Sequence, residues 1–517
     1  MIDRQAEFTS RVRTATLLTL ILILAALLRF PGLSRQCYTL DEFWFAELST
    51  GRGSAHDALP RDVVIVDPPR LTSLNTAPPL RNIAMGMSGT THPPLFPMLL
   101  RVWRTMFGEG DAATRALSAT ASLASVLLLF DIVRLMHGNS FALWAALIMA
   151  LAGPQIMLAR EVRGYSALVV LCLATADALV RVETFGPSIR RIATMLAFAL
   201  ASLLTHYFAV AALTAMGLYA LIRLRGVSRN LAAGALLGAG CIFVALWWPG
   251  LVAQQSPIAN VGGNDHLSDH APNRVPRLIG YAAALPVRLL AEPPKSSFWI
   301  ACCGGVLYLI PILLLRRRAE LWLWVLWLWC TAGLLAALDL RRSTRQLDVI
   351  RYGLIAGPAV YALLATMLKG ARPWLAHALP ACAALAGVMS LPAAYGEQRP
   401  DYRGLAQFVD QRYRTGEIVV FYSLPSIDWV KGALFLETSH YSNQFPWPTV
   451  ILSRPPDASL RRRLRAAPGV WIISGSPQVP FDRIIPDTTV RDPGADWASF
   501  PYLAEVARVQ FTTGSDD

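Results

Sequence analysis

Long apolar blocks alternate with short polar stretches along most of this chain. Each block has the length of a helix that crosses a bilayer, roughly 17–25 residues. Eleven blocks are predicted as membrane spans, at residues 14–33, 112–134, 141–159, 164–181, 192–206, 207–222, 231–250, 298–315, 321–338, 352–368 and 374–395. The pattern predicts an all-α polytopic membrane domain over residues 1–395.

The pattern changes after Tyr395, where short amphipathic helices and short strands replace the long apolar blocks. "YRGLAQFVDQRYR" and "DASLRRRLRAA" have helical spacing, the second with Asp457 as its N-cap. "EIVVFYS" and "GVWIISG" are short runs of strand-forming residues. Residues 396–517 are therefore predicted to form a soluble α/β domain.

The polar segment 34–111 follows the first span and contains two short helical patterns. Leu40, Phe43, Trp44 and Leu48 recur at helical spacing in the first. In the second, the apolar residues share one face and Arg101 and Arg104 take the other; the apolar set is Leu95, Met98, Leu99, Val102, Trp103 and Met106. This second pattern is typical of a helix that lies in the membrane interface.

Short basic segments predict the orientation of the chain. "RVETFGPSIRR", "RLRGVSR", "LRRRAE", "LKGAR" and the N-terminal "MIDRQAEFTSRVRT" all fall on one side of the membrane if the N-terminus is cytoplasmic. Cytoplasmic loops are enriched in Lys and Arg. The longer segments 34–111, 251–297 and 396–517 are then predicted to lie outside.

Composition agrees with a membrane protein and narrows the classes of partner. The chain of 517 residues is 54% hydrophobic and only 16% charged, where soluble domains average about a quarter. The formal net charge is +13, but the cations lie mostly between apolar blocks, and no basic groove with interleaved aromatic residues suggests nucleic acid. The cysteines lie mainly inside apolar runs and have no disulfide or zinc spacing.

Polar and charged groups gather at the predicted outer ends of spans. Five segments contribute, namely "LDE" after the first span, "TTHPP", "AREVRGYS", "HYF" and "LRRSTRQLDVIRYG". Charges near the middle of spans are scarce, whereas a transporter needs them along its pathway. The pattern favours a site at the outer membrane interface that is open to a lipid-borne substrate.

The ordered motifs resemble the membrane-embedded GT-C glycosyltransferases. The similar branch contains the protein O-mannosyltransferases and aminoarabinose transferases, the enzymes like glycosyltransferase family 39. The resemblance rests on "LDEFWFAELS", "THPPLFPMLLRVWRTMFGEGDAATRALSA", "AREVRGYSALVVL", "THYFAV" and "IRYGLIAGPAV". It extends over residues 14–210, is thin from 230 to 340 and returns at 350–360. "RPDYRGLAQFV" resembles the start of the outer α/β domain of some members.

The resemblance implies an inverting transfer of a monosaccharide, a hexose or a pentose, outside the cytoplasm. The implied donor is an undecaprenyl-phosphate-linked sugar, and the acceptor is a lipid, glycan or protein at the periplasmic face of a bacterial inner membrane. No Gly-rich loop for a nucleotide sugar is visible. Two other classes remain open, a lipid or polysaccharide transporter and a non-catalytic scaffold of envelope assembly.

Asp41 and Glu42 are the predicted catalytic residues. Such a transfer needs a base for the acceptor proton, and Asp41 aligns with the family's base. Apolar neighbours disfavour a charged carboxylate, so the pKa of Asp41 is expected to rise. Glu42 would orient Asp41 or bind the acceptor. The alternative is that the acidic pair only favours the start of a helix.

The predicted donor-phosphate residues are His92, Arg160, Arg163, Tyr165, Arg351 and Tyr352. Arg binds phosphate through paired hydrogen bonds, and the two Arg-Tyr patterns favour Arg163 and Arg351 over Arg160. Pro93 and Pro94 fix the backbone that follows His92, and Glu161 is expected to hold one of the arginines. The alternatives are arginines that reach lipid head groups and a histidine that only starts a helix. His206 and Tyr207 are weaker candidates, with interfacial anchoring as the alternative.

A divalent metal is the one cofactor that the sequence raises. His266 and His270 in "NDHLSDH" have a spacing that can chelate such an ion. Members of the aminoarabinose-transferase branch can carry a metal. A polar outer loop without metal is the favoured interpretation.

Overall fold

A computed structural model describes residues 2–254, 273–291, 298–396, 399–423, 431–476, 479–501 and 503–512. The chain divides into two compact units. Unit 1 comprises Met1–Leu33, Thr90–Leu99 and Ala112–Glu397, and unit 2 comprises Ser34–Gly89, Leu100–Asp111 and Gln398–Asp517.

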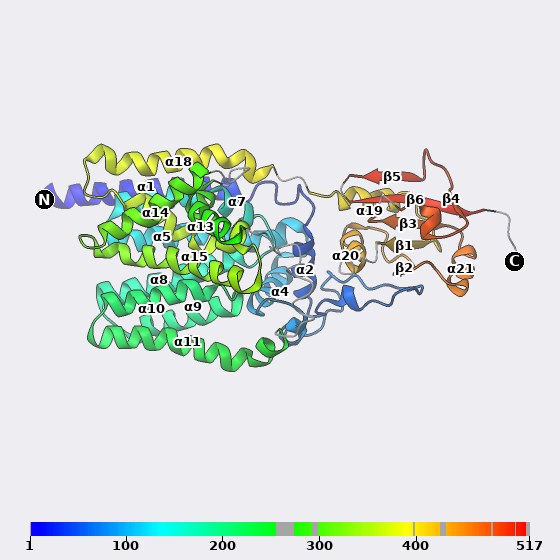
Figure 1. Cartoon of the computed structure of the whole chain (residues 1–517), viewed down its shortest axis with the longest axis horizontal. Helices are drawn as coiled ribbons and strands as arrows, with labels where there is room; N and C mark the ends of the chain where they lie inside the picture. The colour runs from blue at the N-terminus through cyan, green and yellow to red at the C-terminus, as the bar shows by residue number, and fades with distance from the viewer. Residues whose placement is uncertain are drawn as a thin grey trace. The chain divides into compact units, whose positions relative to one another are not determined.

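Unit 1 is built from helices (Figure 1). They are α1 (Ile2–Arg29), α5 (Asp111–His137), α6 (Asn139–Leu151), α7 (Gly153–Ala159), α8 (Tyr165–Phe185), α9 (Ile189–Thr205), α10 (Ala209–Arg223), α11 (Gly226–Ala253), α13 (Arg274–Leu290), α14 (Phe298–Leu314), α15 (Trp322–Arg342), α16 (Ile350–Gly353), α17 (Gly357–Thr366) and α18 (Pro373–Tyr395). α8, α9, α10 and α11 pack side by side, and α6 packs against α1, α17 and α18.

Every predicted span coincides with a helix or a pair of helices, so the prediction of a polytopic helical domain is confirmed. Six helices of the described chain are long and apolar enough to cross a membrane. α6 and α7 are bent by 58° and count as a seventh span if taken together. Pro154 stands in the first turn of α7, where its missing N–H is tolerated. Three further apolar helices are shorter, so the count of eleven crossings stays a prediction.

Part of the segment 251–297, which was predicted to lie outside, is helical and forms α13 (Arg274–Leu290). α13 carries buried Leu278, Leu285 and Leu289, and it packs against α14 and α17. Its apolar residues share one face of the helix. In the sequence, they are interrupted by Arg274, Arg277 and Arg288. Such an amphipathic helix gives no long apolar block, which is why hydropathy did not reveal it.

Unit 2 contains a mixed sheet with strand order β2-β1-β3-β6-β4, and β5 pairs with β6. The strands are β1 (Ile418–Tyr422), β2 (Thr449–Leu452), β3 (Val470–Ser474), β4 (Thr488–Val490), β5 (Trp497–Phe500) and β6 (Ala504–Phe511). β1 is parallel to both neighbours, with Val420 opposite Val450 and Ile472. β6 is antiparallel to β3, β4 and β5. The predicted α/β domain is thus confirmed in architecture.

Four helices accompany the sheet, namely α19 (Tyr402–Asp410), α20 (Lys431–Tyr441), α21 (Ala458–Arg465) and α22 (Phe481–Ile484). The two helices and two strands predicted from the sequence are α19, α21, β1 and β3. The Asp457 side chain accepts a hydrogen bond from the Leu460 N–H at 2.8 Å, so the predicted N-cap of α21 is also correct.

The segment after the first span belongs largely to unit 2, whereas the sequence grouped all of 34–111 with the membrane domain. It contains α2 (Leu40–Leu48), η1 (Ala55–Ala58) and α3 (Arg81–Gly86). α2 and η1 pack against α20, and Ile65 forms a β-bridge with Thr449. These contacts join residues several hundred positions apart, which local patterns do not show.

α4 (Leu95–Phe107) forms the predicted amphipathic helix. Leu99, Val102 and Met106 remain 40%, 47% and 68% exposed, whereas Arg104 on the other side is only 2% exposed. The Arg104 guanidinium donates to the carbonyls of Ala46 and Thr72. An uncovered apolar face of this kind agrees with an interfacial helix.

Candidate functional site

Unit 1 brings together aromatic rings from four separate segments. The His206 ring centroid lies 5.2 Å from that of His92, 5.3 Å from that of Tyr165 and 4.7 Å from that of Phe208. Tyr352 lies 6.4 Å from Tyr165 and 5.4 Å from Phe208. We call these five residues the ring cluster. The predicted site residues His92, Tyr165 and Tyr352 are therefore neighbours.

Helix ends position the members of the ring cluster. His206 and Phe208 lie in the break between α9 and α10, and Tyr165 is the first residue of α8. Before Tyr165, a Cβ added at Gly164 would lie 3.3 Å from the Phe96 ring, so glycine allows a close approach there. Side chains at such breaks are aimed by backbone geometry rather than by the face of one helix.

His92 lies in a bend before two prolines, and its backbone is held by hydrogen bonds. Its carbonyl accepts a hydrogen bond from the Gln254 side-chain amide at 3.1 Å. Burial, and then the nearby Arg351 charge, lower the pKa of His92 to about 4. At neutral pH its imidazole is therefore uncharged and offers one N–H and one lone pair.

The hydrogen bonding of His206 indicates which ring nitrogen carries the proton. Its Nδ1 accepts from the Phe208 backbone N–H at 3.2 Å, so in the neutral ring the proton is on Nε2. The side chain is 6% exposed, and within the described chain its Nε2 has no hydrogen-bond partner. A buried donor without a partner is costly, so this N–H is suited to an acceptor atom of a ligand.

Two predicted arginines lie beside the ring cluster. The Arg351 guanidinium carbon lies 5.1 Å from the centre of the Tyr352 ring, and its buried Nε has no hydrogen-bond partner among the residues described. Arg163, 6% exposed, pairs through Nε with a Glu161 oxygen at 3.2 Å. Glu161 thus holds an arginine, as predicted.

Arg160 has a different environment. Its guanidinium donates to the carbonyls of Arg29, Pro31 and Gly32 at 3.3, 2.7 and 3.2 Å. It also lies over the Tyr395 ring at 4.9 Å. These contacts tie the end of α1 to the chain before α8, and they give Arg160 a structural role.

The acidic pair lies at the start of α2 in unit 2. Asp41 is half-buried in the first turn, and Glu42 is fully buried. Glu42 accepts from the Thr39 backbone N–H at 2.9 Å and from an Arg399 guanidinium nitrogen at 2.7 Å. The alternative interpretation therefore describes Glu42 well, because this carboxylate caps a helix and forms an ion pair.

No described group of three or more His, Cys, Asp or Glu side chains could hold a metal ion. The predicted metal candidates His266 and His270 lie outside the described residues.

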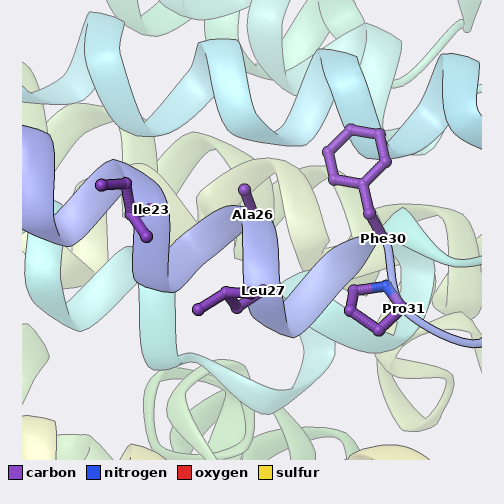
Figure 2. A pocket seen from close by; sticks show the side chains of 5 residues that line it. All are labelled: Ile23, Ala26, Leu27, Phe30 and Pro31. Atoms are coloured by element: carbon purple, nitrogen blue, oxygen red, sulfur yellow. The ribbon is translucent and has the colours of Figure 1, made fainter.

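α1 presents a pocket of about 510 Å³ that is lined by Ile23, Ala26, Leu27, Phe30 and Pro31 (Figure 2). Ile23 and Leu27 are 51% and 62% exposed. All five side chains are apolar, so this pocket suits hydrocarbon and supplies no group for chemistry.

The junction between α9 and α10 contributes two members of the ring cluster, His206 and Phe208. His206 was a weak candidate there, and Phe208 and Gln254 were not selected. The available signal was a polar "HYF" between two nearly contiguous apolar blocks. Such an interruption is costly unless the polar groups face protein or a cavity.

Part of the chain matches a known family model. Residues 91–249 match the family model described as dolichyl-phosphate-mannose-protein mannosyltransferase. This range contains His92, Arg163, Tyr165 and His206. None of the curated proteins searched matches the sequence of the chain.

Among solved structures, the fold is similar to that of ArnT from Cupriavidus metallidurans. The apo form is 13% identical with a TM-score of 0.58, and the form bound to undecaprenyl phosphate is 12% identical with a TM-score of 0.55. In both comparisons the similarity covers 97% of this chain and 98% of the ArnT chain. The chain therefore has the fold of the GT-C glycosyltransferase ArnT, and residues 91–249 resemble the protein mannosyltransferases.

Proposed function

We propose that the chain transfers a monosaccharide from a polyprenyl-phosphate donor to an acceptor at the periplasmic face of a bacterial inner membrane. The observation that carries this proposal is the ring cluster with Arg351 and Arg163 beside it. The cluster supplies one buried N–H donor and a second neutral imidazole, and the two arginines beside it supply two guanidinium groups. Together they suit a phosphate that gains negative charge as its sugar departs.

Each group of the cluster has a distinct part in this proposal. Arg351 and Arg163 supply positive charge, and guanidinium groups bind phosphate oxygens through paired hydrogen bonds. His206 and His92 donate hydrogen bonds from neutral imidazoles, and Tyr165 and Tyr352 line the site. Support for the donor class comes from the ArnT fold, because one ArnT structure holds undecaprenyl phosphate.

The proposed reaction is a single displacement at the anomeric carbon. The bond from that carbon to the donor phosphate oxygen breaks, and its electron pair leaves with the polyprenyl phosphate. The acceptor hydroxyl or amine forms the new bond from the opposite face, which inverts the configuration. Asp41 takes the acceptor proton as the bond forms.

The surroundings of Asp41 support its assignment as the base. It is half-buried beside Glu42, and the ion pair of Glu42 with Arg399 fixes the first turn of α2. The side chains of Arg399 and Glu42 are only 6% and 0% exposed, so solvent screens this pair little. We therefore assign Glu42 to positioning Asp41 rather than to direct catalysis.

Substitution of Asp41 tests the function. Asp41→Asn keeps the shape and removes the base, and general base catalysis contributes roughly 10²–10⁴-fold to rate. Mass spectrometry of lipids, glycans and periplasmic proteins from cells with the wild-type chain should show a sugar adduct that Asp41→Asn cells lose. An adduct that persists in cells with normal levels of the Asp41→Asn protein would refute the catalytic proposal.

A further inference from the structure

Unit 2 contains a polar cavity, which the proposed transfer does not use. Its volume is about 480 Å³. Three parts of unit 2 line it, namely the loop at residues 70–73, the segment at 104–111, and α19 with the end of α20. A volume of this size falls within the range of small-molecule sites.

The floor of the cavity is a fixed hydrogen-bond network around Asp111. One Asp111 oxygen accepts from the Arg403 guanidinium at 2.9 Å and from the Tyr441 hydroxyl at 3.0 Å. The other lies 3.3 Å from Nε2 of His440, whose Nδ1 lies 2.8 Å from the Thr72 hydroxyl. Groups locked in this way present a preorganised surface to a ligand.

The charges of the cavity are largely compensated. Arg403 pairs with Asp111, and Arg104 lies 3.3 Å from Glu109. Arg70 donates to the carbonyl of Ser442 at 2.8 Å and lies over the Phe445 ring at 5.2 Å. Because few cationic donors remain for an anion, these contacts favour a neutral polar ligand over a phosphate.

The rim adds free amides to this floor. Gln407 and Asn443 are exposed lining residues, and within the described chain the side-chain amide of neither forms a hydrogen bond, although the Asn443 backbone N–H donates to Asp410 at 2.6 Å. An amide both donates and accepts, as a sugar hydroxyl does. Amides, paired guanidinium groups and carboxylates around one cavity form a surface for a molecule rich in hydroxyl groups.

We propose that this cavity binds a neutral sugar unit of a glycan-bearing molecule. If the proposed transfer is correct, the molecule that carries this sugar is the acceptor. This assignment as the acceptor rests on the proposed function. Sugar binding itself does not depend on that function, because every lining residue belongs to unit 2.

Saturation-transfer NMR on the full chain in detergent tests the proposal. The probes are the methyl glycosides of glucose, galactose, mannose and arabinose, and the test variant is Gln407→Ala with Asn443→Ala. Gln510→Ala is the matched control, because Gln510 is an exposed amide on β6 that does not line the cavity. Equal thermal midpoints would show that all variants are folded.

At least one glycoside should bind the wild type and the Gln510→Ala control. The double variant should bind it roughly tenfold more weakly, as expected for two lost hydrogen bonds. Absence of binding to the wild type, or unchanged binding to the double variant, would overturn the proposal. Displacement of the glycoside by inorganic phosphate would overturn the assignment to a neutral sugar.

The variant Arg351→Ala separates this proposal from the proposed function. If the cavity binds sugar by itself, Arg351→Ala keeps glycoside binding. Loss of undecaprenyl phosphate binding by that variant would then report on the phosphate site of unit 1 and not on the cavity of unit 2. Failure of either proposal therefore has its own readout.

Discussion

At the residue scale, the ring cluster and Arg351 beside it offer two kinds of donor. Arg351 brings charge, whereas His92 and His206 bring neutral N–H groups. The His206 proton is fixed by the Phe208 backbone N–H, which occupies the other ring nitrogen at 3.2 Å. His206 is therefore expected to act through one oriented hydrogen bond and not through charge.

Two substitutions of His206 separate these roles. His206→Phe keeps the ring packing and removes the donor, so binding of undecaprenyl phosphate should weaken roughly tenfold or more, as expected for a hydrogen bond to a charged group. His206→Gln keeps an N–H donor and should restore part of the affinity. Native mass spectrometry measures both variants. Equal affinity of the His206→Phe variant and the wild type would remove His206 from the site.

Glu437 in α20 gives unit 2 a pH-dependent stability. Burial raises its pKa to about 8, although the Tyr402 hydroxyl and His56 offset part of the shift. The folded state keeps the proton, which an unfolded glutamate loses above about pH 4.3. Stability from this group is therefore lost as pH rises from about 4.3 to about 8.

His56 acts in the same direction as Glu437. Burial lowers the pKa of His56, but its hydrogen bond and charge interaction with Glu47 outweigh this and raise it overall. Its Nδ1 lies 2.6 Å from a Glu47 oxygen. The stability from this pair is present below about pH 6.5 and is lost as pH rises through the folded pKa.

The midpoint of thermal unfolding should therefore be higher at pH 6 than at pH 8.5. Glu437→Gln should reduce this difference and stabilise the chain at pH 8.5, because each pH unit of linkage corresponds to up to about 1.4 kcal/mol. Asp482→Asn is the control, since Asp482 is exposed. A Glu437→Gln variant with the wild-type pH dependence would contradict this assignment.

At the element scale, helix ends determine which side chains meet. The break between α9 and α10 aims His206, and the start of α8 aims Tyr165. Arg160 instead donates to three carbonyls at and just beyond the end of α1, and it anchors that helix end. These contacts favour a structural role for Arg160 over its predicted role in phosphate binding.

Arg160→Ala should lower the stability of the chain without removing the phosphate site. Three hydrogen bonds to carbonyls are lost, each worth about 1 kcal/mol, so the thermal midpoint should fall. Binding of undecaprenyl phosphate should stay within roughly twofold of the wild type, since one hydrogen bond is worth more than that. A loss as large as that of Arg351→Ala would return Arg160 to the phosphate-binding residues.

Local patterns predicted most elements correctly, for physical reasons. Apolar blocks gave the spans, and Asp457 marked the start of α21. Local patterns do not predict contacts between residues that are far apart in the sequence. The pairing of Glu42 with Arg399 joins residues 357 positions apart, and α13 hides its apolar face in an amphipathic pattern.

At the scale of the whole molecule, the fold and the family pattern agree. The family model matches residues 91–249, and the similarity to ArnT extends along nearly the whole chain. Motif order therefore predicted the GT-C type correctly. The donor sugar and the acceptor depend on shapes that motifs do not encode, so they stay within the proposed function.

The central claim is that unit 1 binds a polyprenyl phosphate through the ring cluster and Arg351. Titration with undecaprenyl phosphate, followed by native mass spectrometry, tests it most directly on wild type, Arg351→Ala and the exposed control Arg316→Ala. Wild type and control should bind equally, and Arg351→Ala at least roughly tenfold more weakly, because charge-assisted hydrogen bonds are lost. Absent binding to the wild type, or equal binding by Arg351→Ala, would contradict the account.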